Sequence, residues 1–255
     1  MTPMNGLGIS TSKYTFLDAV TNSYSIDFDG TDDFVNLGNS SEIKLRPTDT
    51  SEGGGITVSC WFKSDVWDGT NSGYNTTAES IISCIQIGGW GITVSTRIAA
   101  YVNIVDPDDA SAYKYLTIVG AYKALDDGDQ SYRASGWFHV VMTFDGRTLE
   151  LYVNGRIETS RITEDVDSTA DDTPIRYATG NNDTDIAIGA DPANLIDGVS
   201  GTADASANFD GKIDQVAIWN KALDIDAAKE MFDAVDVDGD PLDLTEDSGN
   251  YDYSD

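Results

Sequence analysis

The chain carries little positive charge. Only 15 lysine and arginine residues stand against 44 aspartate and glutamate residues, which gives the 255-residue chain a formal net charge of −29. An anionic surface of this kind repels nucleic acid phosphates and anionic lipid headgroups, so we expect neither nucleic acid nor membrane among its partners. The same surface attracts divalent cations, and salt screens its self-repulsion.

Long apolar segments are also missing. No run of about 18 apolar residues occurs, which excludes a transmembrane helix. Residues 1–12 are polar and lack the apolar stretch of about 7 to 15 residues that a secretory signal needs. A domain without an export signal reaches the outside by another route, such as assembly into a phage particle. We therefore expect a virion-surface or extracellular location, with cytoplasmic residence or a fragment of a longer secreted protein as alternatives.

Cysteine and histidine are scarce. Cys60 and Cys84 lie in strand-like runs and not in a CxxC arrangement, which disfavours a cysteine metal site. They form a disulfide if their strands are neighbours, but without an export signal we favour two buried reduced thiols. His139 is the only histidine, so a Ser-His-Asp triad and a histidine-rich metal site both lose support.

A period-two alternation of apolar residues is present instead. In Phe138–Phe144 every second residue is apolar and the positions between them include histidine and threonine, which predicts a strand with one buried face. Leu149–Val153 alternates in the same way, and Asp145-Gly146 supplies turn residues for a hairpin. Other runs rich in Ile, Val, Tyr and Thr alternate with Gly, Asp and Asn clusters. The pattern predicts one large all-β domain.

Only one stretch has a helical pattern. Asp224 can cap a segment in which four apolar residues recur at helical spacing, namely Ile225, Ala228, Phe232 and Val235. We therefore predict a single short helix near the C-terminus.

Three separated segments carry a family resemblance: Tyr24–Gly38, Gly136–Arg156 and Asn208–Leu223. Together they resemble the laminin G-like, concanavalin A-like lectin family, in the branch related to pentraxins. The resemblance implies a jelly-roll β-sandwich of two antiparallel sheets and a role in binding outside the cell. On this basis residues 23–235 form the sandwich, residues 1–22 an N-terminal arm, and residues 236–255 an acidic C-terminal tail or linker.

The triplet Phe-Asp-Gly occurs three times, and Asp-Gly is ordinary turn chemistry. Around the first triplet, Asp29, Asp32 and Asp33 concentrate three carboxylates within five residues. Calcium prefers six to eight such oxygen ligands. A solvated acidic turn is the alternative interpretation.

The resemblance implies that calcium is held between this first turn and the late strand that carries Ile213–Val216. We predict a structural calcium site, with Gln215 weakening it because relatives often carry Glu there. The predicted ligands are Asp29, Asp33 and Asp214, with Asp32 and Asp210 as substitutes.

Sugar recognition requires aromatic faces that stack on pyranose rings. We name four candidates outside the family-like segments, although each is more often a core or ordinary loop residue: Trp67, Tyr74, Trp90 and Tyr113.

A glycoside hydrolase of this fold needs paired carboxylates on one strand face, about 5 Å apart in a retaining enzyme. Glu150 stands alone in its strand, and Glu164–Asp167 lies in a polar, loop-like stretch. We therefore expect no enzyme but a calcium-assisted, lectin-like binding or adhesion module that contacts glycans or protein. The alternative is a structural virion protein, a capsid decoration or fibre subunit that self-associates or binds capsid or tail proteins without binding sugar.

Overall fold

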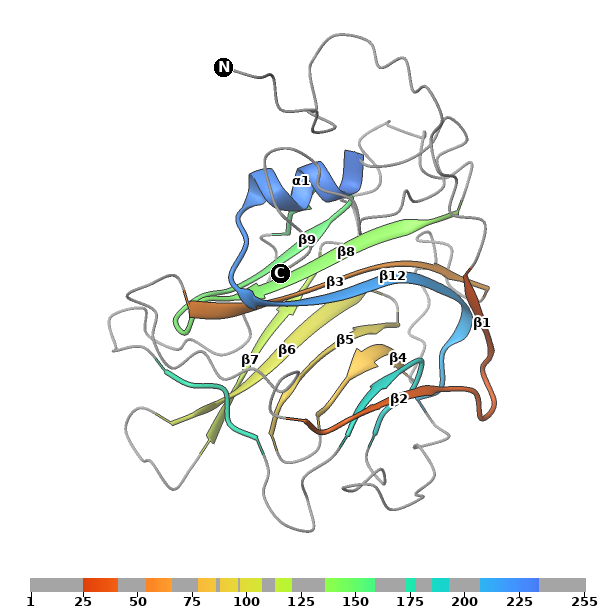
Figure 1. The fold of residues 1–255 in the computed structure, drawn as a ribbon, viewed down its shortest axis with the longest axis horizontal. Helices are drawn as coiled ribbons and strands as arrows, with labels where there is room; N and C mark the ends of the chain where they lie inside the picture. The colour runs from red at the N-terminus through yellow and green to blue at the C-terminus, as the bar shows by residue number, and fades with distance from the viewer. Residues whose placement is uncertain are drawn as a thin grey trace, which may run out of the picture.

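The computed structural model describes residues 25–40, 54–65, 78–85, 88–95, 97–106, 113–120, 136–158, 173–177, 185–192 and 207–233. These residues form two antiparallel sheets of six strands each and one short helix (Figure 1). The predicted all-β sandwich with a C-terminal helix is confirmed. The predicted N-terminal arm (1–22) and acidic tail (236–255) lie outside the described residues.

The first sheet has the strand order β1-β12-β3-β8-β9-β10. Its members are β1 (Ile26–Asp29), β12 (Asp210–Lys221), β3 (Gly54–Ser64), β8 (Phe138–Phe144), β9 (Leu149–Val153) and β10 (Arg156–Ile157). Strand β12 pairs with both β1 and β3, and β3 pairs with β8. The three family-like segments are therefore neighbours in this sheet.

The second sheet has the strand order β2-β11-β4-β5-β6-β7. Its members are β2 (Val35–Gly38), β11 (Ile186–Ile188), β4 (Glu79–Ser83), β5 (Trp90–Val94), β6 (Ile98–Val105) and β7 (Tyr113–Val119). Strands β1 and β2 are edge strands of different sheets, joined by a five-residue connection. That connection crosses from one layer of the sandwich to the other.

The main core lies between the sheets and follows the alternation of the strands. Every second residue of β3 from Ile56 to Phe62 is fully buried in it. Strand β8 contributes Phe138, Val140, Met142 and Phe144 to the same core. These are the residues that the period-two pattern assigned to the buried face, so that part of the prediction is confirmed.

The outer face of the first sheet is covered as well, by the helix α1 (Ile225–Asp233) (Figure 1). Val141 and Trp219 of the sheet pack with Ala228 and Met231 of the helix. All seven residues of β8 are consequently buried. The prediction of one buried face was wrong here, because the second layer of packing comes from a segment more than eighty residues away in sequence.

Helix α1 begins as predicted. The Asp224 Oδ1 atom accepts a hydrogen bond from the Ala227 backbone N–H at 3.0 Å, which is the geometry of an N-cap. Ile225, predicted on the buried stripe, is 43% exposed, whereas Ala228 and Phe232 are buried. No helix among the described residues is long and apolar enough to cross a bilayer.

The two cysteines are buried and are not joined in a disulfide. Cys60 lies in β3 of the first sheet and Cys84 follows β4 of the second. Burial raises the pKa of the Cys60 thiol far above its usual range, so the thiol stays protonated and packs as a small apolar group. This agrees with the interpretation of two reduced thiols.

Candidate functional site

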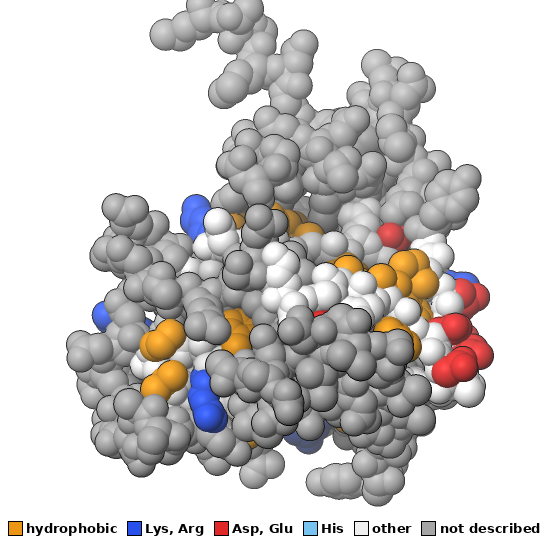
Figure 2. Space-filling view, turned by 60° about the horizontal axis from the view of Figure 1, so that its bottom comes forward, with side chains coloured by type: hydrophobic (Ala, Val, Ile, Leu, Met, Phe, Trp, Pro, Cys, Tyr) orange, Lys and Arg blue, Asp and Glu red, His pale blue; other side chains and the backbone are white. Residues whose placement is uncertain are grey.

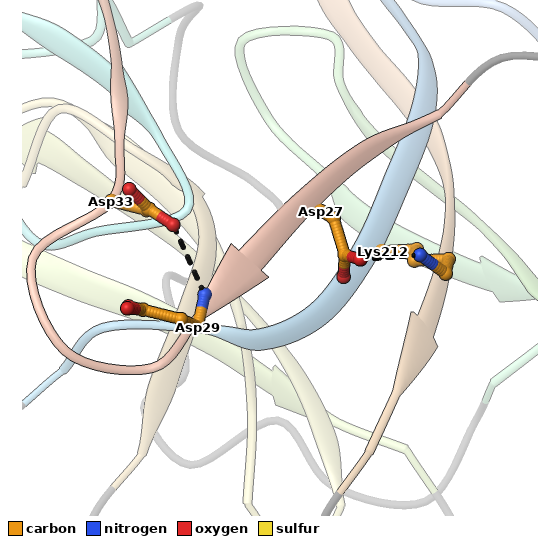
Figure 3. Close-up of polar contacts among 4 residues, drawn as sticks. All are labelled: Asp27, Asp29, Asp33 and Lys212. Atoms are coloured by element: carbon orange, nitrogen blue, oxygen red, sulfur yellow. Dashed lines mark hydrogen bonds and ion pairs between the residues drawn. The ribbon is translucent and has the colours of Figure 1, made fainter.

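The connection between β1 and β2 forms a tight turn over Asp29–Asp33, here called the acidic turn. The Asp29 Oδ1 atom accepts a hydrogen bond from the Thr31 N–H at 2.8 Å. The Asp29 N–H in turn donates to Asp33 Oδ2 at 3.3 Å (Figure 3). These bonds hold the two carboxylates at the ends of the turn on a defined backbone.

Three carboxylates converge at this turn. Asp29, Asp32 and Asp33 are exposed, and each offers an oxygen within 4.8 Å of those of the other two. Calcium–oxygen distances are about 2.3–2.6 Å, so two oxygens on one ion lie at most about 5 Å apart. The three side chains therefore fit the reach of a single calcium ion without a change of backbone.

The acidic turn is poor in compensating positive charge. Lys212 of β12 pairs with Asp27 Oδ2 at 2.7 Å, on the outer face of the sheet (Figure 3). In the described part of the chain no lysine or arginine pairs with Asp29, Asp32 or Asp33. Figure 2 shows acidic side chains gathered at the right-hand edge, the side on which Figure 1 places β1.

Strand β12 and the residues just before it bring further polar groups to the acidic turn. Asp210 is the Cα partner of Asp29 in the β1–β12 pair. Gly30 has a φ of 70°, and a Cβ atom there would lie 2.9 Å from that of Asp210, so both conformation and space require glycine. Asn208 is 7% exposed, and its side-chain amide donates to the Thr31 carbonyl. The Asn208 Oδ1 atom is buried without a partner, so one acceptor beside the turn is unused.

Glu79 at the start of β4 lies close to Asp210 and was not predicted from the sequence. Burial raises the pKa of the Glu79 carboxyl to about 7; a hydrogen bond with the Asp210 backbone opposes this rise, and the negative charge of Asp210 adds to it. The Glu79 Oε2 atom is buried without a partner. Only the packing of one sheet on the other creates this pair, and the stretch 78–85 carries no signal for it.

Asp214, predicted as a calcium ligand, does not reach the acidic turn. It lies four residues beyond Asp210 along β12, which corresponds to about 13 Å of strand. Its Oδ1 atom accepts a hydrogen bond from the Gln215 N–H at 2.7 Å, at a bulge where Gln215 has a φ of 47°. One ion therefore cannot bridge Asp214 and Asp29.

The predicted sugar-stacking residues are not brought together by the described structure. Trp90 is fully buried in β5, and its Nε1–H donates to the Tyr177 hydroxyl at 3.0 Å. It belongs to the core and offers no face to a ligand, which corrects its assignment. Tyr113 is the first residue of β7, and Trp67 and Tyr74 lie outside the described residues.

His139 lies on the outer face of the first sheet under α1. Its Nε2 atom is 2.8 Å from the Ser59 Oγ atom, the spacing of a nucleophile and its base. Both residues are fully buried, and burial lowers the pKa of His139 to about 3. An enclosed, neutral pair of this kind has no route to a substrate and acts as a packing contact.

A laminin G-type family model, described as the Concanavalin A-like lectin/glucanases superfamily, matches residues 37–227. No curated protein matches the chain. Among solved structures, the binding domain of Paraclostridial Mosquitocidal Protein 1 is similar with a TM-score of 0.55 and 15% identity, over 88% of this chain and 48% of that one. The receptor binding domain of botulinum neurotoxin D gives a TM-score of 0.47 and 20% identity, over 88% and 51%.

The chain thus spans about half the length of these two solved structures. At 15% identity, the likeness to the mosquitocidal protein domain concerns the fold alone. The family model extends over most of the sandwich, from β2 to the first turn of α1. On this match, the chain belongs to the concanavalin A-like lectin/glucanases superfamily.

Proposed function

We propose that the chain is a non-catalytic binding module of a virion or cell surface, which uses calcium at the acidic turn when it contacts a glycan or a protein. The convergence of Asp29, Asp32 and Asp33 within reach of one ion is the observation that carries this proposal. The similarity in fold to a toxin binding domain is consistent with it.

The residues present suit calcium better than a transition metal. All three side chains offer hard carboxylate oxygens, and the described residues around the turn offer no thiol or imidazole. Calcium takes six to eight oxygens, so three carboxylates leave positions for water, backbone carbonyls or the hydroxyls of a ligand. When bound, the ion supplies positive charge and open coordination positions at an otherwise anionic edge.

The described residues support binding over catalysis. The Ser59–His139 pair is enclosed, with both side chains fully buried. Burial raises the pKa of the Glu79 carboxyl, and its Oε2 atom is buried against the protein. A glycosidase requires its acid and its second carboxylate to flank an accessible scissile bond.

Thermal unfolding with calcium and with a chelator tests the metal site. A ligand that binds only the folded state stabilises it by about 2.7 kcal/mol at one hundred times its Kd, which raises Tm clearly. We expect this rise in the natural chain and its loss in an Asp32→Asn, Asp33→Asn double variant. Asp226→Asn is the matched control, because Asp226 is also an exposed aspartate but lies on α1. No rise in the natural chain, or an equal rise in the double variant, contradicts the site.

A glycan array and a surface-protein panel, each read with calcium and with chelator, test the binding role. We expect at least one calcium-dependent ligand whose signal the double variant loses. Light scattering on the same samples reports the particle mass. A fixed multimer that ignores every ligand favours a structural virion subunit instead, and release of reducing ends from β-glucan, agarose or alginate favours a hydrolase.

A further inference from the structure

The single histidine of the chain is enclosed between the first sheet and α1. The His139 ring lies 5.0 Å from the Trp61 ring and 6.2 Å from the Phe232 ring, measured between centroids. Trp61 and Phe232 also stack on each other at 5.8 Å, and Trp137 completes this cluster. Phe232 is the α1 residue in the cluster, so the helix supplies the outer wall of the histidine site.

The surroundings of His139 suit a neutral ring and not a charged one. Ser59 on β3 is the hydrogen-bond partner of Nε2, whereas Nδ1 has none. Asn154, in the turn after β9, accepts only from the His139 backbone N–H at 2.9 Å. An imidazolium has two N–H donors, so one of them would be buried without an acceptor.

Charged groups near this site come from the helix, from β12 and from the strands β9 and β10. On β9, Glu150 accepts a hydrogen bond from the hydroxyl of Tyr152, which packs against the helix, and β10, which contacts the helix, carries the exposed Arg156. On α1, Lys229 and Asp233 are exposed and pair with each other, and Glu230 is mostly buried. On β12, Asp214 is the Cα partner of Trp61, one strand further from His139. None of these carboxylates is hydrogen-bonded to the ring, because Ser59 is the side chain bonded to its Nε2 atom and Nδ1 has no partner.

Helix α1 is a small element that packs on the sheet through few side chains. It has nine residues, of which Ala227, Ala228, Met231 and Phe232 provide the buried apolar contacts. Two of these are alanines, which bury little area. Such elements open locally at a lower free energy than the whole domain. Opening of α1 removes Phe232 from the His139 ring and admits water to it.

We propose that α1 is an acid-sensitive cover of the first sheet. Lowering the pH from 7 to 5 shifts the opening equilibrium of α1 towards a state in which the helix has left the sheet and His139 has taken up a proton from water. The surface that opens includes Trp61, Val141 and Trp219, which are buried when α1 is closed. This inference does not depend on calcium binding at the acidic turn.

The expected size follows from proton linkage. In the closed state the pKa of His139 is about 3, and in the open state the ring has its ordinary value of 6.5. At pH 5 protonation of the ring raises the opening constant of α1 about 30-fold, whereas at pH 7 it changes that constant by a factor close to one. The opening constant should therefore rise about 25-fold between pH 7 and pH 5. Glu79 belongs to the second sheet, which stays folded in both states, so its titration cancels.

Amide hydrogen exchange of α1 measures the opening directly. After correction for the pH dependence of the intrinsic exchange rate, protection of residues 228–233 should fall about 25-fold from pH 7 to pH 5. In His139→Gln, protection should not change with pH over this range. Glu230→Gln is the matched control, because it removes the buried carboxylate of α1 and should keep the fall. No fall in the natural chain, or the same fall in His139→Gln, overturns the proposal.

A second measurement tests the proposal without His139→Gln, in case that variant does not fold. The imidazole signals of the lone histidine can be titrated by NMR in the natural chain and in Phe232→Ala. Removal of the Phe232 ring should favour the open state and move the apparent pKa of His139 from about 3 towards 6.5. An apparent pKa that stays at about 3 in a folded Phe232→Ala chain overturns the proposal.

Discussion

The acidic turn and the histidine site are two polar sites on the same sheet, and they treat charge in opposite ways. Asp29, Asp32 and Asp33 are exposed and lie within 4.8 Å of one another at the edge formed by β1. Ser59 and His139 are fully buried on the outer face of β3 and β8. Water screens the three negative charges at the edge, whereas under α1 even one positive charge is disfavoured. Solvent access, and not residue type, decides where this domain can hold charge.

The largest contrast is expected from truncating one apolar side chain at each site. Phe232→Ala opens a cavity against the Trp61 and His139 rings and should lower the free energy of unfolding by about 3–5 kcal/mol. Ile26→Ala on β1 is the matched control, because Ile26 is 48% exposed and should lose less than about 1 kcal/mol. Urea denaturation measures both. Equal losses in the free energy of unfolding would mean that Phe232 of α1 stabilises the domain no more than an exposed residue of an edge strand does.

Acid should destabilise the domain through its single histidine. The folded pKa of His139 is about 3, below its ordinary 6.5, so its contribution to stability is complete above pH 6.5 and is lost as the pH falls towards 3. The loss at pH 5 amounts to about 2 kcal/mol. Urea titrations at pH 7 and pH 5 should show this loss as a difference between the natural chain and His139→Gln, because the titration of every other group, Glu79 included, is common to both chains.

Glu79 acts in the opposite direction in the same experiment. Its folded pKa of about 7 lies above its ordinary 4.5, so its contribution is present below pH 4.5 and is lost as the pH rises towards 7. A Glu79→Gln background removes this opposing pH dependence of the free energy of unfolding and leaves the pH dependence that is due to His139. If the free energy of unfolding depends on pH in the same way with and without His139 in that background, His139 is not the cause of the loss of stability in acid.

Removal of the helix cap should have a smaller effect. Asp224→Ala deletes the acceptor of the Ala227 N–H and should cost about 1 kcal/mol of stability. Asp224→Asn retains a capping oxygen and should cost much less. Chemical denaturation compares the two variants, and an equal loss in both would assign the effect to charge instead of to the hydrogen bond.

The smallest effect is expected at the acidic turn in the absence of divalent cations. Asp32→Asn removes one exposed carboxylate from a cluster of like charges and should change the free energy of unfolding by less than about 0.5 kcal/mol. Thermal melts in chelator check this. A loss as large as that of Asp224→Ala would show that Asp32 supports the fold and is not reserved for a ligand.

Local patterns predicted the features that depend on neighbours in sequence. The alternation in Phe138–Phe144 marked the core face of β8, and Asp224 marked the start of α1. Asp29, Asp32 and Asp33 were predicted together because three carboxylates in five residues must lie close in any turn. The calcium ligation predicted for them awaits the melting experiment.

The features that depend on segments far apart in sequence were not predicted correctly, because local patterns do not show which distant segments become neighbours. Asp214 was expected at the turn on the family resemblance, but it lies four residues beyond Asp210 along β12, which corresponds to about 13 Å of strand. Trp90 was named as a candidate because it is an aromatic residue outside the family-like segments, yet its side chain is buried in the core. Glu79 was missed because its neighbour Asp210 belongs to the other sheet.

The sequence by itself determined the all-β class and the acidic turn, because period, turn chemistry and spacing are properties of short stretches of chain. The family followed from the resemblance of three segments and from the match to the family model. Only the tertiary structure decided which polar groups lose their water. The outer face of β8 is dry because α1 returns to cover it, and the Glu79 carboxyl is perturbed because two sheets meet. Burial depends on every segment that packs around a residue, and no local pattern contains that information.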